Sequence, residues 1–103
     1  MDHYSDRLRN MALELTTEWG ENFRKPIDER ILRIYPELKG DEIAELTTHS
    51  REAEYYIYEL AEQELAGKIT EQDIVPKARE RFAWLDQANA LRLKNIGMFY
   101  ARK

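Results

Sequence analysis

Cysteine is absent from the 103-residue sequence, and glycine and proline are sparse, with four and three residues. Without cysteine the chain cannot form a disulfide framework, an iron–sulfur cluster or a thiolate zinc site. No apolar run approaches the roughly 20 residues of a membrane-spanning helix, and the first residues lack the apolar segment of a secretory signal. Asn-Gly and Asp-Gly turns and sustained apolar–polar alternation are also missing. We therefore expect a soluble, cytoplasmic, all-α protein.

The composition is that of a folded chain, with 43% hydrophobic, 11% aromatic and 35% charged residues. The length suits one compact unit, so we expect residues 1–103 to form a single helical domain. Good helix formers dominate between the glycines and prolines, which predicts a small helical bundle of three long helices plus one short helix. The predicted helices cover residues 5–24, 26–35, 41–66 and 73–97.

Capping residues and helix breakers place these boundaries. Ser5, Asp41 and Asp73 are the residue types that accept backbone N–H groups at a helix N-terminus, so each is predicted as an N-cap. Gly67 is predicted to end the third helix, because glycine is favoured at the position after a helix C-terminus. Gly97 is predicted either to end the last helix or to weaken it before Phe99 and Tyr100.

The helix predicted at 73–97 is apolar over two adjacent stripes. The first contains Ile74, Val75, Ala78, Phe82, Leu85, Leu93 and Ile96. The second contains Trp84, Ala88, Leu91 and Met98. Together they exceed the apolar arc of roughly 100° that a surface helix presents. Either the other helices cover this helix completely, or the second stripe binds a partner protein, most simply a second copy of the chain.

Two tyrosines extend this choice to the third helix. Tyr55 and Tyr58 lie three residues apart, so they are neighbours on a helix surface, and both are expected to face outward. Tyrosine is enriched at protein interfaces because its ring is apolar while its hydroxyl group stays hydrated. The alternative is that the two rings cover the connection that follows the short helix.

His49 offers one candidate for chemistry. Glu45 and Glu52 lie within one helical turn of this imidazole, a spacing that can hold a metal ion. The alternative hypothesis is therefore a metal-dependent helical-bundle enzyme, with Glu14 and Glu18 supplying further carboxylates from the first helix. However, glutamates recur every seven residues on this side of the helix, which is typical of a solvated face.

Other catalytic signatures are missing, and the charge pattern does not favour nucleic acid. There is no Gly-x-Ser-x-Gly motif, glycine-rich phosphate loop or His-Glu-x-x-His motif. Residues 1–74 carry a net charge of −9 and residues 75–103 a net charge of +5, but the basic residues are spread around the last helix without forming the contiguous surface that a phosphate backbone needs. We therefore expect no cofactor and favour a non-enzymatic association module, either a homodimer or an accessory subunit.

Overall fold

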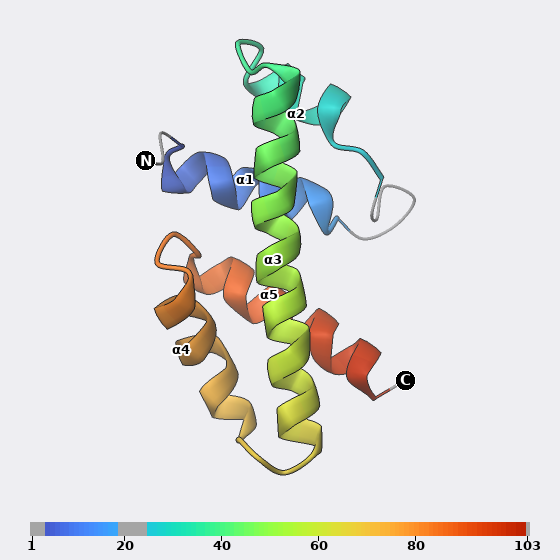
Figure 1. Cartoon of the computed structure of the whole chain (residues 1–103), viewed down its shortest axis with the longest axis vertical. Coiled ribbons are helices and arrows are strands. Elements are labelled where there is room, and N and C mark those ends of the chain that lie inside the picture. The colour runs from blue at the N-terminus through green and yellow to red at the C-terminus, as the bar shows by residue number, and fades with distance from the viewer. Residues whose placement is uncertain (1–3, 19–24, 103) are drawn as a thin grey trace. The chain divides into compact units, whose positions relative to one another are not determined.

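The computed structural model describes residues 4–18 and 25–102 of the chain (Figure 1). These residues contain five helices and no strand, which confirms the all-α prediction. The helices are α1 (Asp6–Thr16), α2 (Asp28–Ile34), α3 (Gly40–Leu65), α4 (Glu71–Arg81) and α5 (Gln87–Ala101). Within this described part, no helix is both long enough and apolar enough to span a membrane.

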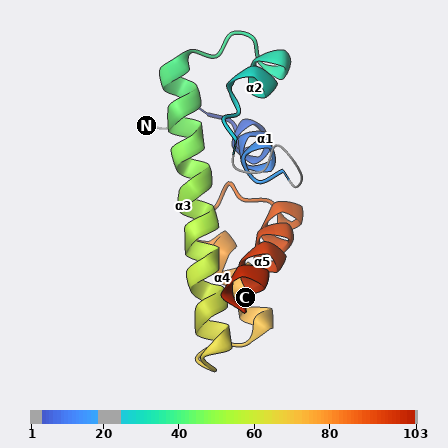
Figure 2. The same ribbon diagram turned by 90° about the vertical axis from the view of Figure 1, so that its right-hand side faces the viewer.

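The chain divides into two units, residues 1–51 and residues 52–103, and α3 contributes to both. In the first unit, α1 and α2 lie beside the first half of α3 (Figure 2). Their buried apolar cluster contains Tyr4, Leu8, Ala12, Ile27, Ile31, Ile43 and Leu46. That the whole chain is one domain stays a prediction.

The N-cap of α1 is as predicted, but the helix is shorter than predicted. The Leu8 N–H donates to the Ser5 hydroxyl oxygen over 3.1 Å, which confirms Ser5 as the N-cap. The helix ends at Thr16 instead of residue 24, and the threonine hydroxyl groups at its end bond back to the chain. Thr16 and Thr17 each donate to the carbonyl oxygen four residues earlier, over 2.8 Å, a pattern that weakens a helix. Residues 19–24 of the predicted helix lie outside the described residues.

The two ends of α3 follow different rules. The helix begins at Gly40, so Asp41 lies in the first turn and the prediction of Asp41 as N-cap is wrong. The carboxylate of Glu42 accepts the Lys39 N–H over 2.8 Å, which closes the first turn without an aspartate cap. At the other end, Gly67 has a φ angle of +79°, which confirms its predicted role after the C-terminus of the helix.

The prediction of one continuous helix over residues 73–97 is wrong, because residues 82–86 separate α4 from α5. Helix α4 begins after Thr70, whose N–H donates to an Asp73 carboxylate oxygen over 2.8 Å in a capping box. Asp73 is therefore the third residue of the helix and not its N-cap. Helix α5 also continues through Gly97 to Ala101, so Gly97 does not end it.

Three hydrogen bonds fix the break between α4 and α5. The Leu85 N–H donates to the Phe82 carbonyl oxygen over 3.0 Å, which closes a turn. The Asp86 carboxylate accepts the Asn89 N–H over 2.8 Å as the N-cap of α5. The Arg79 guanidinium donates to the Leu85 carbonyl oxygen over 3.1 Å, which satisfies a carbonyl of the connection. The predicted excess of apolar surface is thus divided between two helices that bury separate faces.

In the second unit, α4 and α5 pack beside the second half of α3 (Figures 1 and 2). Its buried apolar residues are Ala53, Ile57, Leu60, Ala61, Ile74, Ala78, Leu85, Ala90, Leu93 and Ile96.

Candidate association surface

All six residues predicted for the interface belong to the second unit, but they do not form one stripe. They are Tyr55 and Tyr58 on α3, Trp84 in the connection, and Ala88, Leu91 and Met98 on α5. The break at 82–86 removes Trp84 from the helix that carries the other three stripe residues. The residues of the predicted surface therefore lie in three separate places: on α3, in the connection and on α5.

One side of α5 faces outward and carries exposed, uncharged side chains. Ala88, Leu91, Asn95 and Phe99 follow one another at three- and four-residue steps, and all four are exposed. Leu91 is 44% exposed and Phe99 is 56% exposed, values that are high for large apolar side chains. Met98 is half-buried at the edge of this face. We call these five residues the α5 outer face.

The basic residues of α5 are held on the flanks of the helix by partners within the same unit. The Lys94 ammonium lies 2.8 Å from the Glu71 carboxylate, and the hydrogen bond from Lys94 lowers the pKa of Glu71. Arg102 forms an ion pair with Glu64 of α3, and Arg92 donates to the Asn89 amide oxygen over 3.0 Å. Each of these basic residues is thus paired with an acceptor in its own unit.

Helix α5 crosses α3 at Gly97. A methyl carbon built on Gly97 would lie 3.4 Å from the Tyr58 Cα atom and 3.5 Å from the Ile57 carbonyl oxygen. The two backbones therefore approach each other at Tyr58, and Met98, the next residue, lies at the same crossing. This approach fixes α5 against α3 at a buried position.

The two predicted tyrosines differ in how open they are. Tyr55 is 66% exposed, whereas Tyr58 is half-buried. The negative charge of Glu62 raises the pKa of the Tyr58 hydroxyl group, together with burial and a hydrogen bond between the two side chains. The Tyr58 hydroxyl group is thus bonded to Glu62 of the same helix, and the Tyr55 side chain is the more exposed of the two.

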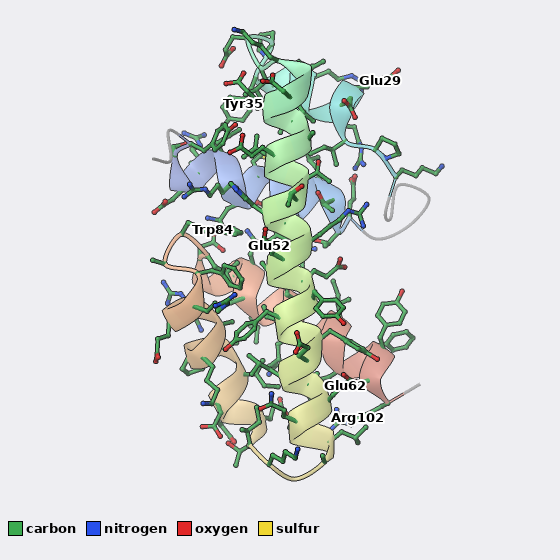
Figure 3. All side chains as sticks on the ribbon, in the orientation of Figure 1. Glu29, Tyr35, Glu52, Glu62, Trp84 and Arg102 are labelled. Atoms are coloured by element: carbon green, nitrogen blue, oxygen red, sulfur yellow. The ribbon has the colours of Figure 1, made fainter. Side chains whose placement is uncertain are left out.

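Trp84 belongs to an aromatic group that the sequence did not predict. Trp84 itself lies in the connection between α4 and α5 (Figure 3). Its ring lies 6.0 Å from the Phe82 ring, which in turn meets the Tyr56 ring edge-on at 5.7 Å. The Arg81 guanidinium lies 5.4 Å from the centre of the Tyr56 ring and 5.5 Å from that of Phe82. We call these four residues the Arg81 cluster. The alternation of aromatic residues just after Arg81 was the only sequence signal for it.

The predicted metal ligands are not assembled into a site. The Tyr4 hydroxyl group donates to Glu45 over 3.0 Å, and the Tyr4 ring meets the His49 ring edge-on at 6.1 Å. Burial and this hydrogen bond raise the pKa of Tyr4 to about 12. Within residues 4–18 and 25–102, no group of three or more His, Asp or Glu side chains is arranged to hold a metal ion. The metal-dependent alternative therefore has no geometric support in the described ranges.

The second unit offers groups that can bind rather than transform a ligand: an uncharged apolar face with one amide, and three aromatic rings beside a guanidinium group. Comparisons of the chain with models of protein families, with curated proteins and with solved structures find no match.

Proposed function

We propose that the protein is a non-enzymatic association module that forms a homodimer through the α5 outer face. The observation that supports this function is the exposure of Leu91 and Phe99 on one side of a helix. Large apolar side chains that are exposed together on one face are typical of a protein interface. Symmetric dimers are the commonest assemblies of soluble proteins.

The residues of this face suit a second copy of themselves. None of them is charged, so the five residues themselves place no like charges opposite each other about a two-fold axis. The face runs from small Ala88 to large Phe99, over about 16 Å at 1.5 Å per residue. An antiparallel arrangement sets the small end of one face against the large end of the other. Asn95 then lies near the axis, where its amide group can both donate and accept a hydrogen bond.

The contacts that hold α5 in place support the same function. The close approach at Gly97 and the ion pairs of Lys94 and Arg102 fix the helix before any partner arrives. A surface that is already ordered loses less conformational entropy on binding. Tyr55 extends the surface from the crossing onto α3, where its exposed ring can cover the edge of the interface.

The test is the mass in solution measured by light scattering at tens of micromolar. We expect twice the chain mass of 12.3 kDa for the parent protein, and the mass of a single chain for Leu91→Glu, because a buried, unpaired carboxylate is costly in an interface. Leu65→Glu is the matched control, since Leu65 is 52% exposed on α3 and lies outside the proposed surface. Circular dichroism checks that both variants keep their helices.

Two results would overturn the proposal. One is a parent protein that is already a single chain under these conditions, which leaves the face free or assigns it to a different protein. The other is equal dissociation by Leu91→Glu and Leu65→Glu, since that would show a general effect of added charge.

A further inference from the structure

Arg81 is exceptional among the arginines of the second unit. The other three each donate to an acceptor in the same unit: Arg79 to the Leu85 carbonyl oxygen, Arg92 to Asn89 and Arg102 to Glu64. Arg81 instead lies over the rings of Tyr56 and Phe82, and no described residue accepts its N–H groups. Its side chain is exposed, so its donors face solvent.

The rings of Tyr56 and Phe82 favour one position of this guanidinium group. A cation that lies within about 6 Å of an aromatic ring centre is attracted by the negative face of the ring. Arg81 meets two rings at such distances, and Phe82 is itself packed between Tyr56 and Trp84. The ring contacts therefore restrict part of the rotamer freedom of the arginine before a ligand binds, which reduces the entropic cost of binding.

The geometry of the group selects its ligand. Five N–H donors in a planar fork match the two oxygens of a carboxylate, and the fork accepts such a group in a bidentate manner. The half-buried Trp84 ring beside Phe82 can contact an apolar neighbour of that carboxylate. Tyrosine, tryptophan and arginine are also the residue types that dominate the energetics of protein interfaces.

The surrounding charges favour a single carboxylate over a chain of phosphates. Glu80 precedes Arg81 in the sequence. Lys77 lies one helical turn before Arg81, and its charge acts on Asp73. Residues 52–103 carry nine acidic and eight basic side chains. A polyanion needs an excess of positive charge along its length, which this balance does not supply, whereas one carboxylate needs only Arg81.

We propose that the Arg81 cluster binds a segment of a partner protein in which a glutamate or aspartate is flanked by apolar residues. The carboxylate pairs with Arg81, and the apolar neighbours contact Trp84 and Phe82. This surface shares no residue with the α5 outer face, so it does not depend on the homodimer.

The probe is a blocked tripeptide, acetyl-Leu-Glu-Leu-amide, and its uncharged match is acetyl-Leu-Gln-Leu-amide. Each is titrated at millimolar concentrations into nitrogen-15-labelled protein while the Arg81 Nε–H and the Trp84 indole N–H are followed by NMR. We expect both signals to shift with the glutamate peptide and to stay nearly still with the glutamine peptide. Arg81→Gln should weaken binding, followed at Trp84, by about tenfold or more, because a charge-assisted bidentate contact is lost.

Two variants separate recognition from charge. Arg33→Gln makes the same change of charge at an exposed arginine of α2 and should leave the titration unchanged. Arg81→Lys keeps the charge without the fork and should still weaken binding several-fold. The proposal is overturned if the two peptides shift the signals equally, if Arg81→Gln and Arg33→Gln have the same effect, or if a short oligothymidylate binds through Arg81 while the peptides do not.

Discussion

Gly97→Ala is expected to stabilise the protein, even though Gly97 lies where two helices cross. The added methyl carbon would lie 3.4 Å from the Tyr58 Cα atom and 3.6 Å from a side-chain carbon of Ile57, which is close but ordinary van der Waals contact. Glycine inside a helix costs about 0.5–1 kcal/mol relative to alanine, because it loses more backbone freedom on folding. The free energy of unfolding should therefore rise by about that amount.

Gly67→Ala makes the same chemical change with the opposite expected sign. Nothing lies within 4 Å of the added methyl carbon, but Gly67 has a φ angle of +79°. A residue with a Cβ atom pays roughly 1–2 kcal/mol in this left-handed region. The pair of variants thus separates backbone preference from space, since only one site is crowded and only the other is left-handed.

Chemical denaturation followed by circular dichroism measures both changes in the free energy of unfolding. In thermal unfolding, each kcal/mol corresponds to a shift of about 4–8 °C in Tm for a chain of this size. Gly97→Val adds two further carbons against the α3 backbone and should destabilise the protein by about 1–3 kcal/mol. If Gly97→Ala destabilises the protein as strongly as Gly97→Val, α5 lies closer to α3 than described and the reasoning fails.

Two further predictions concern pH. Hydrogen bonds from Thr70 lower the pKa of Asp73 below its ordinary value of 3.8, so the stability they contribute is present above pH 3.8 and is lost as the pH falls through the lower pKa of the folded state. The stability of Asp73→Asn should therefore depend less on pH during acid unfolding than that of the parent protein. Equal pH dependence of the two proteins would contradict the capping box. Burial and Glu45 raise the pKa of Tyr4 from 10.0 to about 12, so its contribution is complete below pH 10 and is lost toward pH 12. The stability difference between the parent and Tyr4→Phe, measured by urea denaturation, should narrow over this interval, and a constant difference would refute the assignment.

Short-range signals in the sequence were sufficient for several boundaries. The Ser5 cap and the Gly67 terminus depend on one residue type and its immediate neighbours, so they could be predicted without knowledge of packing. The start of α4 was misplaced because Thr70 and Asp73 are both good capping residues. In the structure they act together, and only the reciprocal bond shows that the helix starts after the threonine.

The break between α4 and α5 was beyond prediction from propensity. Residues 82–86 contain neither glycine nor proline, and their apolar spacing continues the pattern of a single helix. The structure ends α4 where Arg79 can reach the Leu85 carbonyl oxygen, a contact that exists only once the chain has turned. Asp86, three residues before Asn89, was the one local signal of a new N-terminus.

This error also decided which parts of the surface could be predicted. Ala88 and Leu91 were placed correctly on a common face, because both belong to α5. The predicted stripe left out Phe99, although Phe99 is more exposed than Leu91. The Arg81 cluster requires α3 beside α4, and a pattern within one helix cannot show a contact between two.

The connection at 82–86 has a consequence for binding as well as for the fold. On one continuous helix, Trp84 and Leu91 would lie on the same stripe; the break instead places Trp84 in the Arg81 cluster and leaves Leu91 on the outer side of α5. Interrupting a helix exposes N–H and carbonyl groups that need new partners. The chain supplies them through Arg79 and the Asp86 cap, and a cap of this type contributes about 0.5–2 kcal/mol. These two contacts satisfy groups that the break exposes, so that α4 and α5 contribute to two chemically different surfaces, one built on Leu91 and Phe99, the other aromatic and cationic.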